Sequence, residues 1–143
     1  DLERPIPAAT GAFDAVVALD VLEHVEAIHA ALTELIRISR QKVFLSLPNM
    51  TCLSFRLHFL RHGVLSAKYS LLPEHQGDRH RWLTSYPQVT HFVRMIAQQT
   101  GCQVAQYDLL TGYGRWQMLS ARLPLPAALR TYTQLFELTK APA

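Results

Sequence analysis

The apolar residues in the first third of the chain form two continuous runs separated by a helical spacing. Residues 15–19 (AVVAL) are apolar throughout, which is typical of a strand covered on both faces in a parallel sheet. Residues 42–47 form a second such run, closed by Pro48, which cannot continue a central ladder. Between the runs, apolar or small side chains recur every three or four residues and predict one helix: Val25, Ile28, Ala31, Leu32, Leu35, Ile36 and Ser39. Strand, helix and strand in this order predict a βαβ unit with parallel pairing.

The middle of the chain predicts two helices with a long irregular segment between them. Residues 49–60 have a mixed apolar pattern that predicts a helix ending at Gly63. Residues 86–100 have the pattern of an amphipathic helix, and Gly101 suits the position after its last turn. Residues 64–84 show no period, and a loop of this length is usually a lid, a binding loop or disordered.

The last third of the chain predicts a hairpin and a terminal helix. We expect residues 102–110 and 116–123 to pair antiparallel at the edge of the sheet, through a turn at 111–114. We expect residues 127–138 to form a short helix, followed by a frayed tail.

Composition places the chain among globular proteins. It has 143 residues, of which 49% are hydrophobic and 17% charged, enough for one small domain with a core. No apolar run approaches the roughly 20 residues of a membrane span, so no membrane partner is expected. The two cysteines do not make a disulfide framework, and a reduced, cytoplasmic setting is the default expectation. The net charge of +3 comes from scattered basic residues without an aromatic-lined stripe, so we expect no nucleic-acid partner.

Two motifs resemble a known family. FDAVVALDVLEHV, from Phe13 to Val25, resembles the fourth-strand motif of Rossmann-like S-adenosylmethionine (SAM)-dependent methyltransferases, and VFLSLPN, which ends at Asn49, resembles their fifth strand. RLHFLRHGVLSAKYSLLP is similar to the methionine-biosynthesis type of this family. The resemblance implies an α/β fold: the C-terminal half of a methyltransferase sheet, with parallel strands, an antiparallel edge hairpin and flanking helices. Residues 1–143 would be a single partial domain.

The resemblance also leads us to expect that the chain is a fragment. The family's glycine-rich loop and the acidic residue of its second strand have no counterpart in the sequence. We therefore expect the 143 residues alone not to catalyse methyl transfer and to bind SAM more weakly than micromolar.

The resemblance implies a set of cofactor contacts. Ala18, Leu19 and Asp20 would line the sulfonium and amino-acid end of SAM, largely through their backbone. Asp1, with Leu2 beside it, would accept a hydrogen bond from the adenine amino group. The alternatives are plain core for Ala18 and Leu19 and a solvated chain end for Asp1.

Asp20, Glu23 and His24 match the acid-x-x-Glu-His cluster that holds a divalent metal in some relatives, including small-RNA methyltransferases. Oxygen ligands with one imidazole would suit Mg²⁺ or Mn²⁺. His24 is also a candidate general base, because an imidazole titrates near working pH. A structural hydrogen bond at a helix start is the remaining account. We expect no bound metal, with this cluster as the alternative.

The candidate substrate contacts are Asn49, Arg79, His80 and Arg81. The two arginines could clamp a carboxylate or a phosphate, or they could belong to a solvated charged loop. His58 and His62 lie four residues apart on one predicted helix face, without a third metal ligand in sequence.

The sequence therefore predicts that the parent protein transfers a methyl group from SAM to a small molecule. Two alternatives stay open: a non-catalytic binding domain that keeps the methyltransferase fold, and a nucleotide-binding oxidoreductase of similar topology.

Overall fold

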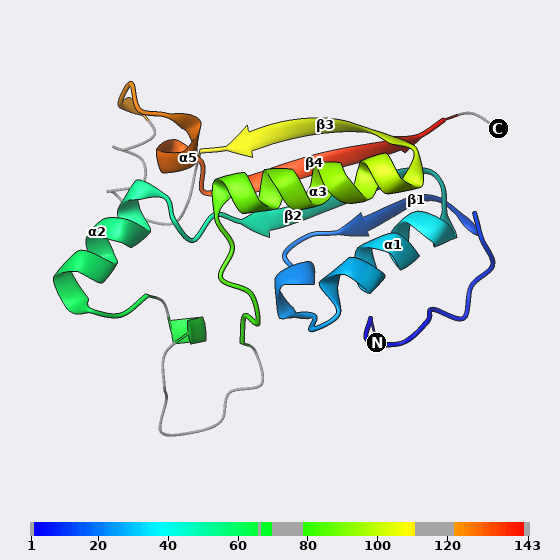
Figure 1. The fold of residues 1–143 in the computed structure, drawn as a ribbon, viewed down its shortest axis with the longest axis horizontal. Coiled ribbons are helices and arrows are strands. Elements are labelled where there is room, and N and C mark those ends of the chain that lie inside the picture. The colour runs from blue at the N-terminus through cyan, green and yellow to red at the C-terminus, as the bar shows by residue number, and fades with distance from the viewer. Residues whose placement is uncertain (1, 66, 70–78, 111–121, 142–143) are drawn as a thin grey trace.

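The computed structural model describes residues 2–65, 67–69, 79–110 and 122–141 (Figure 1). In chain order its elements are β1 (Phe13–Ala18), the 3-10 turn η1 (Leu22–His24), α1 (Ile28–Ile38), β2 (Ser39–Pro48), α2 (Leu53–His62), the 3-10 turn η2 (Ala67–Tyr69), α3 (Tyr86–Thr100), β3 (Cys102–Leu109), α5 (Ala127–Arg130) and β4 (Thr133–Lys140).

The described strands form one mixed sheet in the order β1-β2-β4-β3. β1 and β2 pair in parallel, with Val16 opposite Val43 and Ala18 opposite Leu45. β4 runs antiparallel to both of its neighbours, β2 and β3. The predicted βαβ unit is confirmed, as is the presence of antiparallel strands at the sheet edge.

The helix predicted over residues 127–138 was wrong beyond Arg130, where α5 ends and a strand, β4, follows. In the described residues, the antiparallel partner of β3 is β4. Gln134, Phe136 and Leu138 are buried and alternate with half-buried neighbours, which is the period of a strand. The predicted strand at 116–123 lies largely outside the described residues.

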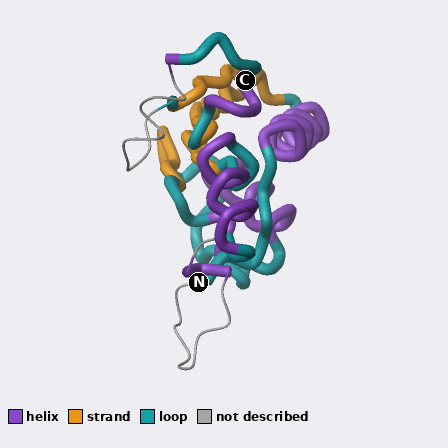
Figure 2. Tube along the Cα trace, turned by 90° about the vertical axis from the view of Figure 1, so that its left-hand side faces the viewer, coloured by secondary structure: helices purple, strands orange, loops and turns teal. Residues whose placement is uncertain are grey.

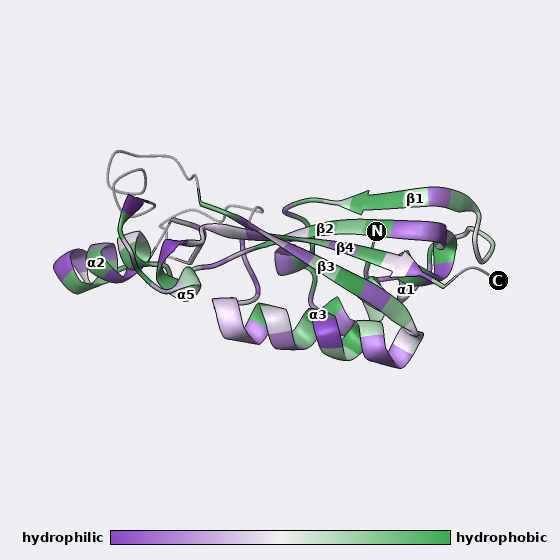
Figure 3. Cartoon of the chain, turned by 90° about the horizontal axis from the view of Figure 1, so that it is seen from above, coloured by the Kyte–Doolittle hydropathy of each residue, from purple (hydrophilic) through white to green (hydrophobic). Residues whose placement is uncertain are grey.

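Helices α1 and α3 pack on the same face of the sheet (Figures 1 and 3). Figure 2 gives the view from the side, with the strands seen largely end on. The core between the helices and the sheet consists of apolar side chains from both layers, including Leu32, Leu35, Val43, Leu45, Val89, Val93, Phe136 and Leu138. The predicted buried stripes of both helices are confirmed.

The other face of β1 is exposed, contrary to the prediction of a strand covered on both faces. Phe13 is 50% exposed and Val17 is 63% exposed. Among the described residues, the two helices that pack on the sheet lie on the opposite side (Figure 3). No helix in the described ranges has both the length and the apolar character needed to cross a bilayer.

Glu34 and Arg37 on α1 form hydrogen bonds with the segment that precedes β1. Their side chains form an ion pair of 2.7 Å. Glu34 Oε1 also accepts a hydrogen bond from the Ile6 amide, and Arg37 donates to the carbonyl oxygens of Ile6 and Ala8. The hydrogen bond from Arg37 lowers the pKa of Glu34 from 4.5 to about 2.

We expect this arrangement to contribute to acid stability. A carboxyl whose pKa is lower in the folded state stabilises the fold above pH 4.5 and loses that contribution as the pH falls towards 2. Glu34→Gln should therefore reduce stability at neutral pH and flatten its decline in that window. Urea unfolding at a series of pH values measures this, with the solvent-exposed Glu26→Gln as a control; parallel pH profiles for Glu34→Gln and wild type would contradict the expectation.

Candidate functional site

The chain leaves β1 through a residue in an unusual conformation. Asp20 has a φ of 52° and is the one residue other than glycine with positive φ in the described part of the chain. Its conformation is held by Ser46 on β2, whose Oγ accepts from the Asp20 amide and donates to Asp20 Oδ1. Positive φ in a non-glycine residue is uncommon and gathers at functional sites. The turn directs the chain into η1 at the carboxyl end of the parallel strands.

Glu23 lies in η1 with its side chain inside the protein. It is 2% exposed, and its Oε2 is buried without a hydrogen-bond partner among the described residues. Burial, with a smaller contribution from the charge of Asp20, raises the pKa of Glu23 above its ordinary value of 4.5. A buried carboxylate oxygen without a partner costs free energy, which a cation beside it would offset.

The two imidazoles next to Glu23 are fixed in one tautomer by their partners. His24 Nδ1 lies 3.0 Å from the Arg79 carbonyl oxygen, which only accepts, so Nδ1 carries the proton. Tyr69 donates its hydroxyl proton to the Trp82 carbonyl oxygen, and His80 Nδ1 lies 3.0 Å from that hydroxyl, so His80 Nδ1 is also a donor. In neutral form, both rings then offer Nε2 as the atom with a lone pair.

Glu23, His24 and His80 form a group close enough together to hold a metal ion. One ligand atom from each lies within 4.8 Å of the other two. The rings of His24 and His80 meet edge to face with centroids 4.7 Å apart. Nδ1 protons held by a carbonyl and a hydroxyl are the outer-shell arrangement that orients metal-bound histidines. One carboxylate and two imidazoles suit Mn²⁺, Fe²⁺, Co²⁺ or Zn²⁺ better than Mg²⁺.

The segment that carries His80 is fixed along η1 by hydrogen bonds. The Arg81 amide donates to the Glu23 carbonyl oxygen, and Trp82 Nε1 donates to the Val25 carbonyl oxygen. Thr84 Oγ1 donates to the carbonyl oxygen of Pro48 at the end of β2. Residues 79–84 are therefore attached to both β2 and the turn after β1, which positions His80 over Glu23.

The other residues predicted to contact the cofactor lie in different environments. Ala18 is 4% exposed and belongs to the core, whereas Leu19 is 50% exposed and Asp20 is also exposed at the sheet end. Leu2 is half-buried and packs against the core. Asp1 lies outside the described residues.

The residues predicted to contact the substrate also lie in different environments. Arg79 and Arg81 are exposed, and Arg81 pairs with Glu26 at 3.1 Å. His80 turns towards His24 and Glu23. Asn49 is fully buried, and its amide bonds to groups of Thr51, Tyr86, Ala128 and Thr131. In this structure Asn49 has no exposed atom for a substrate.

Sequence reasoning missed His80 as a partner of Glu23 and His24. No spacing signals it, because 55 residues separate His24 from the segment that carries Arg79 and His80. Asp20, the predicted third member, is not in the group; its carboxylate turns to Ser46 instead.

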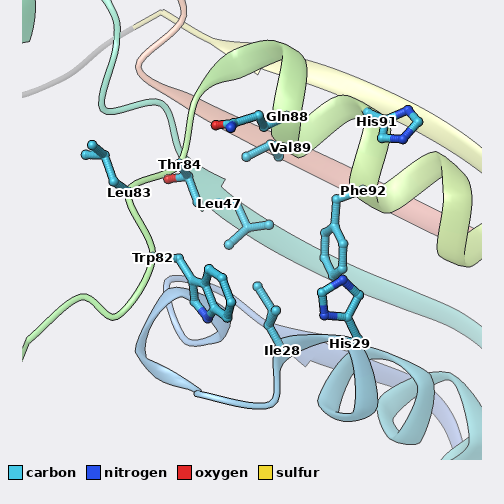
Figure 4. A pocket seen from close by; sticks show the side chains of 10 residues that line it. All are labelled: Ile28, His29, Leu47, Trp82, Leu83, Thr84, Gln88, Val89, His91 and Phe92. Carbon is cyan, nitrogen blue, oxygen red and sulfur yellow. The ribbon is translucent and has the colours of Figure 1, made fainter.

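A separate cavity of about 350 Å³ lies between α1 and α3 (Figure 4). Ile28, Leu47, Trp82 and Phe92 contribute to its mostly apolar lining, and His29 contacts Phe92 edge to face. Its lining contains none of Glu23, His24 and His80. The cavity is therefore distinct from the candidate metal site.

The first part of the chain matches a known family model. Residues 1–47, which include β1, η1, α1 and most of β2, match the model described as "Methyltransferase domain". No curated protein sequence matches the chain.

Solved methyltransferase structures share the fold. Magnesium protoporphyrin IX methyltransferase from Synechocystis with bound SAH has a TM-score of 0.55 and 19% identity, over 99% of this chain and 49% of that one. A possible histamine N-methyltransferase from Thermotoga maritima has a TM-score of 0.57 and 14% identity, over 98% and 61%. The small RNA methyltransferase HEN1 has a TM-score of 0.57 and 15% identity, over 92% and 15%.

The described chain thus has the fold of class I SAM-dependent methyltransferases, as the sequence motifs led us to expect. It spans between 15% and 61% of the length of these three structures.

Proposed function

We propose that the protein containing this chain transfers a methyl group from SAM to a small-molecule acceptor, and that Glu23, His24 and His80 bind a divalent metal ion beside the acceptor. The observation that carries the metal site is the convergence of three potential ligands around a buried carboxylate oxygen without a partner. The methyltransferase motif and fold support the methyl transfer.

The residues at the end of β1 fit the cofactor side of this reaction. Leu19 is exposed, and the Asp20 carboxylate, held by Ser46, is in position to receive a cationic or hydrogen-bonding group. The alkyl-sulfonium donor carries its own leaving group, so the protein mainly aligns donor and acceptor. Asp20 and Leu19 would provide this alignment from one side.

The metal ligands fit the acceptor side. A bound divalent ion would lower the pKa of a coordinated acceptor hydroxyl and so favour the nucleophilic form. Three protein ligands leave coordination positions open for acceptor oxygens. Tyr69 and the Arg79 carbonyl hold the imidazoles through Nδ1, and the fixed segment 79–84 keeps His80 in place.

Calorimetric titration with SAM of the whole protein that contains this chain tests the methyltransferase proposal. We expect binding that Asp20→Ala weakens about tenfold or more, because a charge-assisted hydrogen bond contributes about 1.5–3 kcal/mol. Asp14→Ala, at the other end of β1, is the matched control and should leave the affinity unchanged.

The same measurement separates the proposal from its main alternative. A protein that binds neither SAM nor its demethylated product would be a binding domain with a methyltransferase fold. Equal effects of Asp20→Ala and Asp14→Ala would contradict the proposed placement of SAM at the end of β1.

A further inference from the structure

Helix α2 differs from the other long helices because it contributes nothing to the core. None of its residues, from Leu53 to His62, is buried. It extends from the end of β2, away from the layer formed by α1 and α3 (Figure 1). Its Leu60, at 83%, is the most exposed large hydrophobic side chain in the described part of the chain.

The three leucines of α2 form a stripe on its outer side, whereas its two phenylalanines, Phe55 and the 51% exposed Phe59, lie on the other side. At about 100° per residue, Leu53, Leu57 and Leu60 fall within an arc of roughly 60°. Leu57 is 50% exposed, and Val64, just after the helix, is 49% exposed. Phe55 lies on the opposite side, where its ring stacks on Tyr132 at 5.5 Å. The leucine stripe therefore points away from the body of the protein.

Cationic side chains flank this stripe on both sides. On the same helical projection, Arg56 and Arg61 lie about 40° beyond the two edges of the stripe. No described acidic side chain pairs with either arginine. The sequence contains no Asp or Glu from residue 35 to residue 73, so the residues before and after α2 in the sequence also add no negative side chain.

We propose that α2 docks onto the surface of a lipid bilayer that contains anionic lipids. Leucines between two arginines match the headgroup and acyl boundary, where an apolar stripe enters the acyl region and guanidinium groups stay at the phosphates. The stripe itself is aliphatic, whereas a single-stranded nucleic acid would favour an aromatic stacking surface. No helix in the described residues is long and apolar enough to cross a bilayer, but surface docking needs only an exposed apolar stripe flanked by cations.

Flotation of the whole protein that contains this chain with lipid vesicles tests the proposal. We expect binding to vesicles of phosphatidylcholine mixed with phosphatidylglycerol, and little binding to pure phosphatidylcholine. Arg56→Gln with Arg61→Gln should weaken binding about 25-fold, at about fivefold per arginine. Leu60→Ser should weaken it roughly tenfold, because an exposed leucine that becomes buried in lipid is lost.

Matched controls are available outside α2. Arg94→Gln on α3 and Leu123→Ser remove an exposed arginine and a 41% exposed leucine elsewhere, and both should bind as wild type. Circular dichroism confirms that each variant is folded. Absence of wild-type vesicle binding, or equal binding by the α2 variants, would overturn the proposal. The proposal would also be overturned if the protein bound a labelled single-stranded RNA through these two arginines and did not bind the vesicles.

Discussion

Glu23→Gln is expected to lower the affinity of the protein for Mn²⁺ by at least about 100-fold. The substitution removes a carboxylate from a group of three ligands, and changes in the outer shell alone cost about 10–100-fold in metal affinity. Calorimetric titration with Mn²⁺ measures the affinity, and the absorption spectrum of a Co²⁺ complex reports the coordination. His80→Ala should have an effect of similar size, and Tyr69→Phe, which removes the partner of His80 Nδ1, about tenfold.

The stability of the metal-free protein distinguishes a ligand from a structural residue. Glu23 Oε2 is buried without a described partner, so Glu23→Gln should not destabilise the metal-free protein. A structural hydrogen bond at this position predicts a loss of stability instead. Urea unfolding in the presence of a chelator measures the difference.

His62→Ala is the matched control for the metal experiment. His58 and His62 on α2 have ring centroids 4.6 Å apart and are the other close imidazole pair in the described structure. Loss of Mn²⁺ binding in His62→Ala but not in Glu23→Gln would place the metal on α2 and contradict the proposed site.

Local periodicity was sufficient to predict the first half of the fold. The buried stripe of α1 and the two apolar runs specify a βαβ unit because the residues that pair are close in sequence. The same reasoning failed at residues 133–138, since an apolar segment this short fits a strand or a helix equally. Its assignment depends on pairing with β2, about 90 residues earlier: Phe136 lies opposite Leu45.

The candidate site was predicted only where it is local. Glu23 and His24 are adjacent in sequence, and a motif identifies them. His80 joins them because residues 79–84 bond to both η1 and β2, a tertiary arrangement that no sequence spacing encodes. For Asn49 the sequence was misleading. Its position after a strand suggests a substrate contact, but the folded chain buries it completely.

Asn49→Ala is expected to destabilise the protein by roughly 3–4 kcal/mol. Its Oδ1 accepts from the backbone amides of Thr51 and Tyr86, and its Nδ2 donates to the carbonyl oxygens of Ala128 and Thr131 at 2.8 Å each. The amide thus joins the end of β2 to the start of α3 and to the turn before β4. Removal leaves several buried groups without partners, at about 1–3 kcal/mol for each group left unsatisfied, partly offset by relaxation.

Two further variants separate this structural role from a substrate contact. Asn49→Asp keeps the shape but places an oxygen against two carbonyl oxygens, so it should destabilise at neutral pH at least as much as the alanine variant. Gln103→Ala removes an exposed amide from β3 and should change stability by less than about 0.5 kcal/mol. Urea unfolding measures all three. If Asn49→Ala kept wild-type stability and lost only affinity for an acceptor, Asn49 would be a substrate contact, and the hydrogen bonds around it would contribute little to the fold.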